Sequence, residues 1–67
     1  MTAVAPHTKR LRELDADTRE AWSAYSDRLR DLSGEEYERL EPESWSELQA
    51  ELRRLERRRE ELAASAA

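Results

Sequence analysis

Few side chains in this sequence have the type and spacing that catalysis requires. His7 is the only histidine, and it stands beside Pro6 with no apparent partner. Ser23, Ser26 and Ser44 have no histidine or lysine at a helical spacing that would activate a hydroxyl nucleophile. Because a general base needs both a partner and a fixed position, we predict that the protein is not an enzyme.

The sequence also lacks the residue patterns that bind metals or cofactors. Helical bundles hold di-metal centres with Glu-x-x-His pairs that face the core, and the sequence contains no such pair. It also contains no cysteine, so neither disulfides nor cysteine-based zinc sites are available. We therefore expect no metal, no cofactor and no small-molecule substrate.

Charge is the chemical feature with the clearest pattern. Residues 35–51 hold seven glutamates and one arginine, a net charge of −6, whereas residues 52–62 hold five arginines and three glutamates, a net charge of +2. The arginine cluster, Arg53, Arg54, Arg57, Arg58 and Arg59, could bind phosphate groups, which makes a nucleic-acid-binding accessory protein the alternative function. However, no aromatic residue lies among these arginines, and the net charge of −4 opposes binding to a polyanion. A solvated helix face explains them better.

The composition indicates that helices position all of these residues. The chain has 67 residues, enough for one domain, and the sheet formers Phe and Ile are absent. Leu, Ala, Glu and Arg dominate, and all four favour helix. No stretch is long and apolar enough for a membrane span, and residues 1–7 have no apolar run, so we expect a cytoplasmic protein without a secretory signal. The strong excess of Arg over Lys suggests a GC-rich, bacterial genome.

The first long helix is predicted from residue 8 onward. Apolar and small residues recur at steps of three and four on one helix face, namely Leu11, Leu14, Thr18, Ala21, Trp22, Tyr25, Leu29 and Leu32. Asp17 and Glu20 resemble a capping box, which would start the main helix near Thr18 instead. We favour one helix over Thr8–Leu32 because the first two leucines continue the same stripe, and the later start stays open.

A short helical turn is expected to follow. Gly34 can adopt the left-handed conformation that ends a helix. Ser33 and Glu36 form a capping signal for a short helix over Glu35–Leu40. Pro42 disfavours helix in the residue before it, so this piece is expected to stop there.

The last helix is predicted over Pro42–Ala63, where Ser44 and Glu47 offer a second capping box. Its apolar positions follow a strict heptad, with Trp45, Leu52 and Arg59 at one position and Leu48, Leu55 and Leu62 at the other. A sustained seven-residue period is typical of a helix packed against another helix, as in a coiled coil. Leu52, central in this pattern, is expected to be the residue least tolerant of substitution.

Together these elements predict an all-α fold: an antiparallel helical hairpin over residues 8–63, with a flexible tail at 1–7 and a frayed tail at 64–67. Folding the helices back on each other sets Trp45 against Leu32 and Leu52 against Tyr25. The apolar area exceeds what one neighbouring helix can cover. We therefore expect a homodimer arranged as a four-helix bundle.

The apolar surplus defines the expected partner-binding residues, which are Trp22, Tyr25, Leu29, Tyr37, Leu40, Trp45 and Arg59. Arg59 falls at a heptad core position near the open end, where its guanidinium could reach Glu13 or a carboxylate of a second chain. The predicted function is a small helical protein–protein interaction module, a homodimeric adaptor or a regulator of a larger protein. A membrane-surface role is disfavoured because anionic lipid repels the glutamate-rich polar faces.

Overall fold

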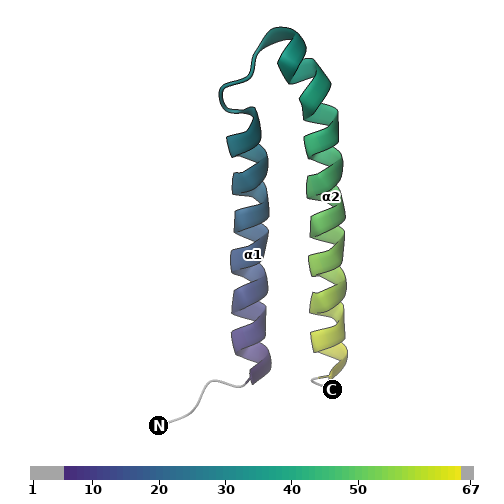
Figure 1. The fold of residues 1–67 in the computed structure, drawn as a ribbon. Coiled ribbons are helices and arrows are strands. Elements are labelled where there is room, and N and C mark those ends of the chain that lie inside the picture. The colour runs from purple at the N-terminus through teal and green to yellow at the C-terminus, as the bar shows by residue number, and fades with distance from the viewer. Residues whose placement is uncertain (1–5, 66–67) are drawn as a thin grey trace.

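The computed structural model describes residues 6–65 of the chain and the side chains of residues 8–65. The described part consists of two helices, α1 over Pro6–Leu29 and α2 over Gly34–Ser65. The helices pack side by side and run antiparallel, so that the start of α1 and the end of α2 lie at the same end of the molecule (Figure 1). The predicted all-α helical hairpin is confirmed.

The first helix is continuous, which answers the question of where it starts. It begins at Pro6, slightly before the predicted start, because proline is well tolerated in the first turn of a helix. The Thr18 hydroxyl donates a 2.8 Å hydrogen bond to the carbonyl oxygen of Leu14, so Thr18 lies inside α1. Of the two predicted tails, residues 1–5 and 66–67 lie outside the described residues.

Residues 30–33 reverse the chain between the helices. The amide of Leu32 donates a 3.2 Å hydrogen bond to the carbonyl oxygen of Leu29, the short-range pattern that tightens a helix end. Gly34 then adopts a φ of 60°, the left-handed conformation expected for it, which costs glycine little because it has no Cβ atom. The first helix ends a few residues earlier than predicted, so this glycine opens α2 and does not cap α1 directly.

The expected helix break at Pro42 is wrong. α2 continues through this residue, so the predicted short helix over Glu35–Leu40 forms its first turns. A proline inside a helix removes one backbone hydrogen bond and crowds the carbonyl four residues earlier, which bends the helix without ending it. Figure 1 shows the first turns of α2 leaning toward the side of α1. Ser44 and Glu47 consequently lie inside α2, and Glu47 forms an ion pair with Arg28 of α1 instead of capping a helix.

The core is a row of leucines between the two helices. Among the described residues, the buried apolar side chains are Leu14, Leu29, Leu48 and Leu55, which are 3–8% exposed. Leu52, expected to be the most sensitive position, is only half-buried and lines an outward hollow with Gln49 and Arg53. The expected importance of Leu52 is therefore corrected in favour of Leu48 and Leu55, the second heptad position.

The register between the helices also differs from the expected one. Trp45 contacts Trp22 and Tyr25, with ring centroids 6.2 and 5.6 Å away, and does not pair with Leu32. The difference follows from the continuous helix through Pro42. Because α2 starts at Gly34, its residues lie farther from the turn than they would in a helix that starts at Pro42.

The hairpin is a single layer of helices. Its extents are 54 × 24 × 7 Å, and the smallest of these is close to the roughly 5 Å width of one helix backbone. Its radius of gyration is 16.0 Å, whereas a compact domain of this length has about 11 Å. Both broad faces of the hairpin are therefore open to solvent. Neither helix, over the residues described, has the length and apolarity needed to cross a membrane.

Candidate protein-binding surface

Three aromatic rings from the two helices meet on one broad face of the hairpin. The ring centroids of Trp22 and Tyr25 in α1 lie 6.3 Å apart, and those of Trp22 and Trp45 of α2 lie 6.2 Å apart. The three ring planes meet at 67–87°, the edge-to-face arrangement that contributes about 0.5–1.5 kcal/mol per pair beyond surface burial. Trp22 and Trp45 nevertheless remain 44% and 42% exposed. We call these three residues the aromatic cluster.

Tyr25 is the half-buried member of the cluster, and a hydrogen bond fixes its ring. Its hydroxyl donates to the carboxylate of Glu41 over 2.6 Å. This hydrogen bond raises the pKa of Tyr25 to about 12, with further contributions from burial, from the charge of Glu41 and from the nearby Tyr37. Because Tyr25 is held between the helices, the exposed indole rings have a fixed support.

The remaining predicted partner-binding residues are dispersed. Leu29 is 8% exposed and belongs to the core of the hairpin. Leu40 is half-buried beside Arg28 and Glu47, away from the aromatic cluster. Tyr37 is 41% exposed and lies among the glutamates at the start of α2. Among the predicted partner-binding residues, the structure thus brings only the rings of Trp22, Tyr25 and Trp45 into contact.

Arg59 joins the two helices near the open end. Its guanidinium donates a 2.9 Å hydrogen bond to the carboxylate of Asp15 in α1, and both side chains are roughly half exposed. The expectation that Arg59 reaches across to a carboxylate of α1 is correct in kind, but the partner is Asp15 and not Glu13. Sequence reasoning missed Asp15 because it lies next to the apolar stripe and forms no motif with its neighbours.

We define the aromatic face as the broad face that carries Trp22, Trp45, Leu52 and the Asp15–Arg59 ion pair. Leu52 belongs to it because it lies seven residues, or two helical turns, beyond Trp45. At the edge of this face, on the outer side of α2, Leu52 lines a hollow together with Gln49, Arg53, Glu56 and Arg57. The aromatic face therefore combines exposed indole rings with a partly apolar hollow.

The opposite face carries a hollow that neither tryptophan of the cluster lines. This hollow, of about 150 Å³, lies between the helices, and its apolar walls come from Ala21, Ala24, Leu48 and the ring of Tyr25. Its rim is charged, because Arg28 and Glu47 form an ion pair across it. The two broad faces of the hairpin thus differ in chemistry.

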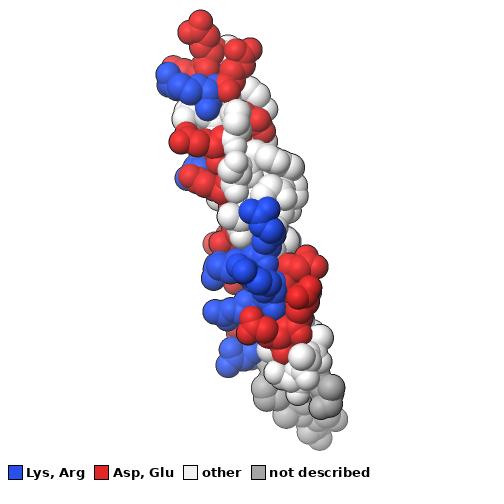
Figure 2. Space-filling model, turned by 90° about the vertical axis from the view of Figure 1, so that its right-hand side faces the viewer, with Lys and Arg blue, Asp and Glu red and all other residues white. Residues whose placement is uncertain are grey.

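The charges divide along the length of the molecule. Viewed from the side of α2, acidic side chains gather at the turn end, and the arginines lie along the other half with acidic side chains beside them (Figure 2). The acidic end comes from the glutamates of residues 35–47 and the basic region from the arginine cluster. The molecule therefore has an acidic end and a mixed, partly basic end.

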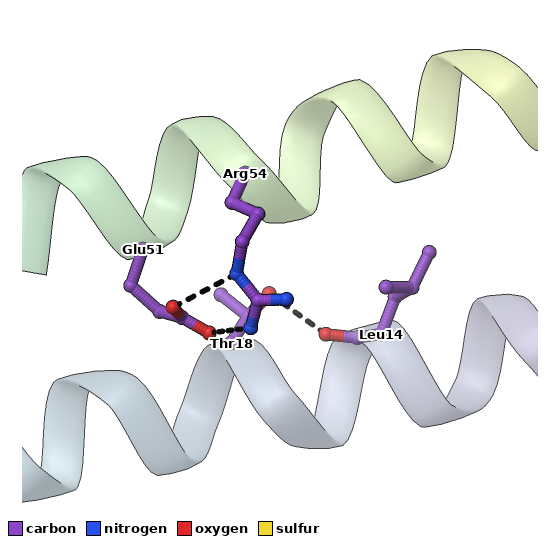
Figure 3. Close-up of polar contacts among 4 residues, drawn as sticks. All are labelled: Leu14, Thr18, Glu51 and Arg54. Carbon is purple, nitrogen blue, oxygen red and sulfur yellow. Dashed lines mark hydrogen bonds and ion pairs between the residues drawn. The ribbon is translucent and has the colours of Figure 1, made fainter.

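Two members of the arginine cluster are already paired within the chain. Arg54 forms a two-pronged ion pair with Glu51, at 2.5 and 3.1 Å, which lowers the pKa of Glu51 and raises that of Arg54. Figure 3 shows the guanidinium of Arg54 beside the carboxylate of Glu51, on the side of α2 that faces α1. Arg59 is bound to Asp15, as described above. These pairs reduce the positive charge that the cluster offers to a phosphate backbone.

Within the described residues no group of three or more His, Cys, Asp or Glu side chains is arranged to hold a metal ion. Comparison of the chain with protein-family models, with curated proteins and with solved structures gives no significant match in any of the three. Inferences about function therefore depend on the surface of the hairpin itself.

Proposed function

We propose that this protein is a helical protein–protein interaction module whose binding surface is the aromatic face. One observation carries the proposal: Trp22 and Trp45 are 44% and 42% exposed although they form part of a fixed aromatic cluster. Exposed tryptophans surrounded by polar residues are typical anchors of protein interfaces, because they bury a large apolar area at little entropic cost. The surface is preorganised by the hydrogen bond between Tyr25 and Glu41.

The partner that fits this face is a helical surface with an apolar stripe. Two helices that lie side by side present a groove along their length, into which the side chains of a further helix can pack. The hairpin exposes 5565 Å² of surface, compared with about 4,400 Å² for a compact monomer of its mass. An added layer of helices would cover this surplus. The charged opposite face would stay free for a second protein, which is the arrangement that an adaptor or regulator requires.

The arginine cluster gives weaker support to nucleic-acid binding. Arg54 and Arg59 are engaged in ion pairs within the chain, and no aromatic ring of the described cluster lies among the arginines. The contributions that stabilise binding to nucleic acid, free positive charge and base stacking, are therefore limited. The two functions respond differently to salt, because binding to a polyanion weakens steeply with salt and an apolar interface does not.

Affinity capture with matched variants tests the proposed function. The tagged wild-type chain, Trp22→Glu and Ala24→Glu are incubated with extract of the native host and with the untagged chain, and the bound polypeptides are quantified. Ala24 is the control because it lies two residues from Trp22, about 160° around the helix, and lines the hollow of the opposite face. Both variants introduce the same carboxylate into the same helix.

The proposal predicts that the wild type and Ala24→Glu retain the same bound polypeptide and that Trp22→Glu loses it. Circular dichroism of Trp22→Glu establishes that the hairpin is still helical. Equal recovery by all three chains would contradict the proposal, because the aromatic face would then play no part in binding.

A further inference from the structure

We infer that the partner of the aromatic face is a second copy of this chain, bound antiparallel about a two-fold axis at the level of Trp22 and Trp45. This inference rests on the proposed function and names the partner. A two-fold interface uses the same patch on both copies, so residues at the axis meet their own counterparts and all other residues meet residues an equal distance away on the other side.

The position of the two tryptophans suits such an axis. Trp22 and Trp45 belong to different helices, but the centroids of their rings lie 6.2 Å apart, so their heights along the hairpin differ by no more than this distance. An axis that crosses both helices at this height sets each tryptophan against the same tryptophan of the other copy. Four indole rings would then cover one another, and the most costly exposed apolar area of each copy would leave water together.

The charges on either side of Trp45 distinguish the antiparallel arrangement from the parallel one. The hollow of the aromatic face spans residues 49–57, which are four to twelve positions after Trp45. Residues 33–41 occupy the same range of positions before Trp45, and they contain four glutamates and one arginine. The antiparallel arrangement therefore brings the acidic start of each α2 to the same height as the arginine-rich residues 53–57 of the other copy.

The parallel arrangement would bring like charges to the same height. Its two-fold axis would run along the helices, so that α2 of each copy lies across from α1 of the other, with the two acidic segments at one height and the two arginine-rich segments at another. Like charges in contact oppose association, whereas complementary charges favour it and fix the register. The charge pattern thus selects the antiparallel dimer.

The area of the face is sufficient for a stable dimer. The hairpin measures 54 × 24 Å across its broad face. Each partner in a typical stable complex contributes roughly 800 Å², which is less than the face of this hairpin offers even when the two copies overlap only in part. The dimer would be a four-helix bundle with the leucine core inside each hairpin and the tryptophans between the hairpins.

Distances between spin labels test the arrangement directly. The chain contains no cysteine, so a single introduced cysteine carries the only label. Ser46→Cys lies next to Trp45, near the axis, and Ser65→Cys lies at the exposed end of α2. With a rise of 1.5 Å per residue, antiparallel copies place the labels at position 65 about 60 Å apart, while those at position 46 stay within roughly 20 Å.

A short distance at position 46 with a long one at position 65 supports the inference. Short distances at both positions would overturn it in favour of a parallel dimer. The absence of any intermolecular distance at both positions would mean that the second copy is not the partner. In that case capture of another polypeptide that depends on Trp22 would leave the proposed function standing, and loss of such capture would refute both.

Charge reversal gives a second, independent test. Glu35→Arg/Glu38→Arg and Arg53→Glu/Arg57→Glu each place like charges at the same height at both ends of the antiparallel interface. We expect each double variant alone to dimerise at least about tenfold more weakly, and an equimolar mixture of the two to recover the wild-type affinity. Glu60→Arg/Glu61→Arg is the control, because these residues lie beyond the overlap. Unchanged affinity of the double variants, or no recovery on mixing, would overturn the inference.

Discussion

The hydroxyl of Tyr25 in α1 donates a 2.6 Å hydrogen bond to the carboxylate of Glu41, which directly precedes the proline inside α2. This bond links the aromatic cluster to the acidic start of α2. It holds the Tyr25 ring between the helices and leaves the two tryptophans facing outward. The raised pKa of the Tyr25 hydroxyl leads to a prediction about stability at high pH.

Stability is expected to fall at high pH through Tyr25. The pKa of its hydroxyl is about 12 in the folded chain and 10.0 ordinarily, so the folded state holds the proton more tightly. The contribution is complete below pH 10.0 and is lost as the pH rises toward about 12. Urea unfolding at a series of alkaline pH values, for the wild type and Tyr25→Phe, measures it. An identical pH dependence of the two chains would contradict the role of this hydrogen bond.

Leu55→Ala is expected to destabilise the hairpin far more than Leu52→Ala. Leu55 is 3% exposed, so truncation leaves a cavity in the core and costs about 2–5 kcal/mol. Leu52 is half-buried on the aromatic face, so its truncation should act mainly on association and depend on protein concentration. Thermal melts at two concentrations separate these effects. Equal losses of stability for both variants at every concentration would mean that Leu55 is not more central to the core than Leu52.

Pro42→Ala is expected to straighten the start of α2. Restoring the missing backbone hydrogen bond should stabilise the helix by up to about 3 kcal/mol and raise its helical circular dichroism signal. A straighter helix would also move Glu41 relative to Tyr25, so the pKa of Tyr25 should return toward its ordinary value. Absorbance titration of tyrosinate measures this change. A Tyr25 pKa that stays near 12 would mean that the bend does not position Glu41.

Asp15→Asn is expected to cost a small but measurable amount of stability. The ion pair with Arg59 is partly exposed, so its loss should cost about 0.2–1 kcal/mol and fade at high salt. Glu13→Gln is the matched control, since it removes a carboxylate from the same turn. A larger effect of the Glu13 substitution would show that the sequence-based assignment of the Arg59 partner was the better one.

The periodicity of the sequence was sufficient to predict the hairpin, because the leucines at steps of three and four define one buried face on each helix. It could not predict that α2 continues through Pro42. Local preference disfavours helix before a proline, but contacts such as that between Tyr25 and Glu41 outweigh it. The predicted pairing of Trp45 with Leu32 was wrong for the same reason, because a helix that starts at Pro42 sets Trp45 too close to the turn.

The heptad pattern identified the right residues but not their order of burial. Trp45, Leu52 and Leu55 all fit the pattern, yet only Leu55 faces the centre of the interface between the helices. In a single layer, each helix buries only a narrow strip of its surface against its neighbour. The heptad position of Trp45 and Leu52 therefore lies at the edge of this strip and stays partly exposed. The partners of charged residues were also hard to predict, because Asp15 and Glu13 differ only in their angle around the helix.

Sedimentation equilibrium at micromolar concentration tests the central claim that the aromatic face pairs with a second copy. The chain has a mass of 7.9 kDa, and we expect the wild type to sediment at twice this mass. Trp22→Glu should sediment as a monomer, and Ala24→Glu as a dimer. A wild-type chain that stays at 7.9 kDa, with a cooperative and stable melt, would contradict the claim.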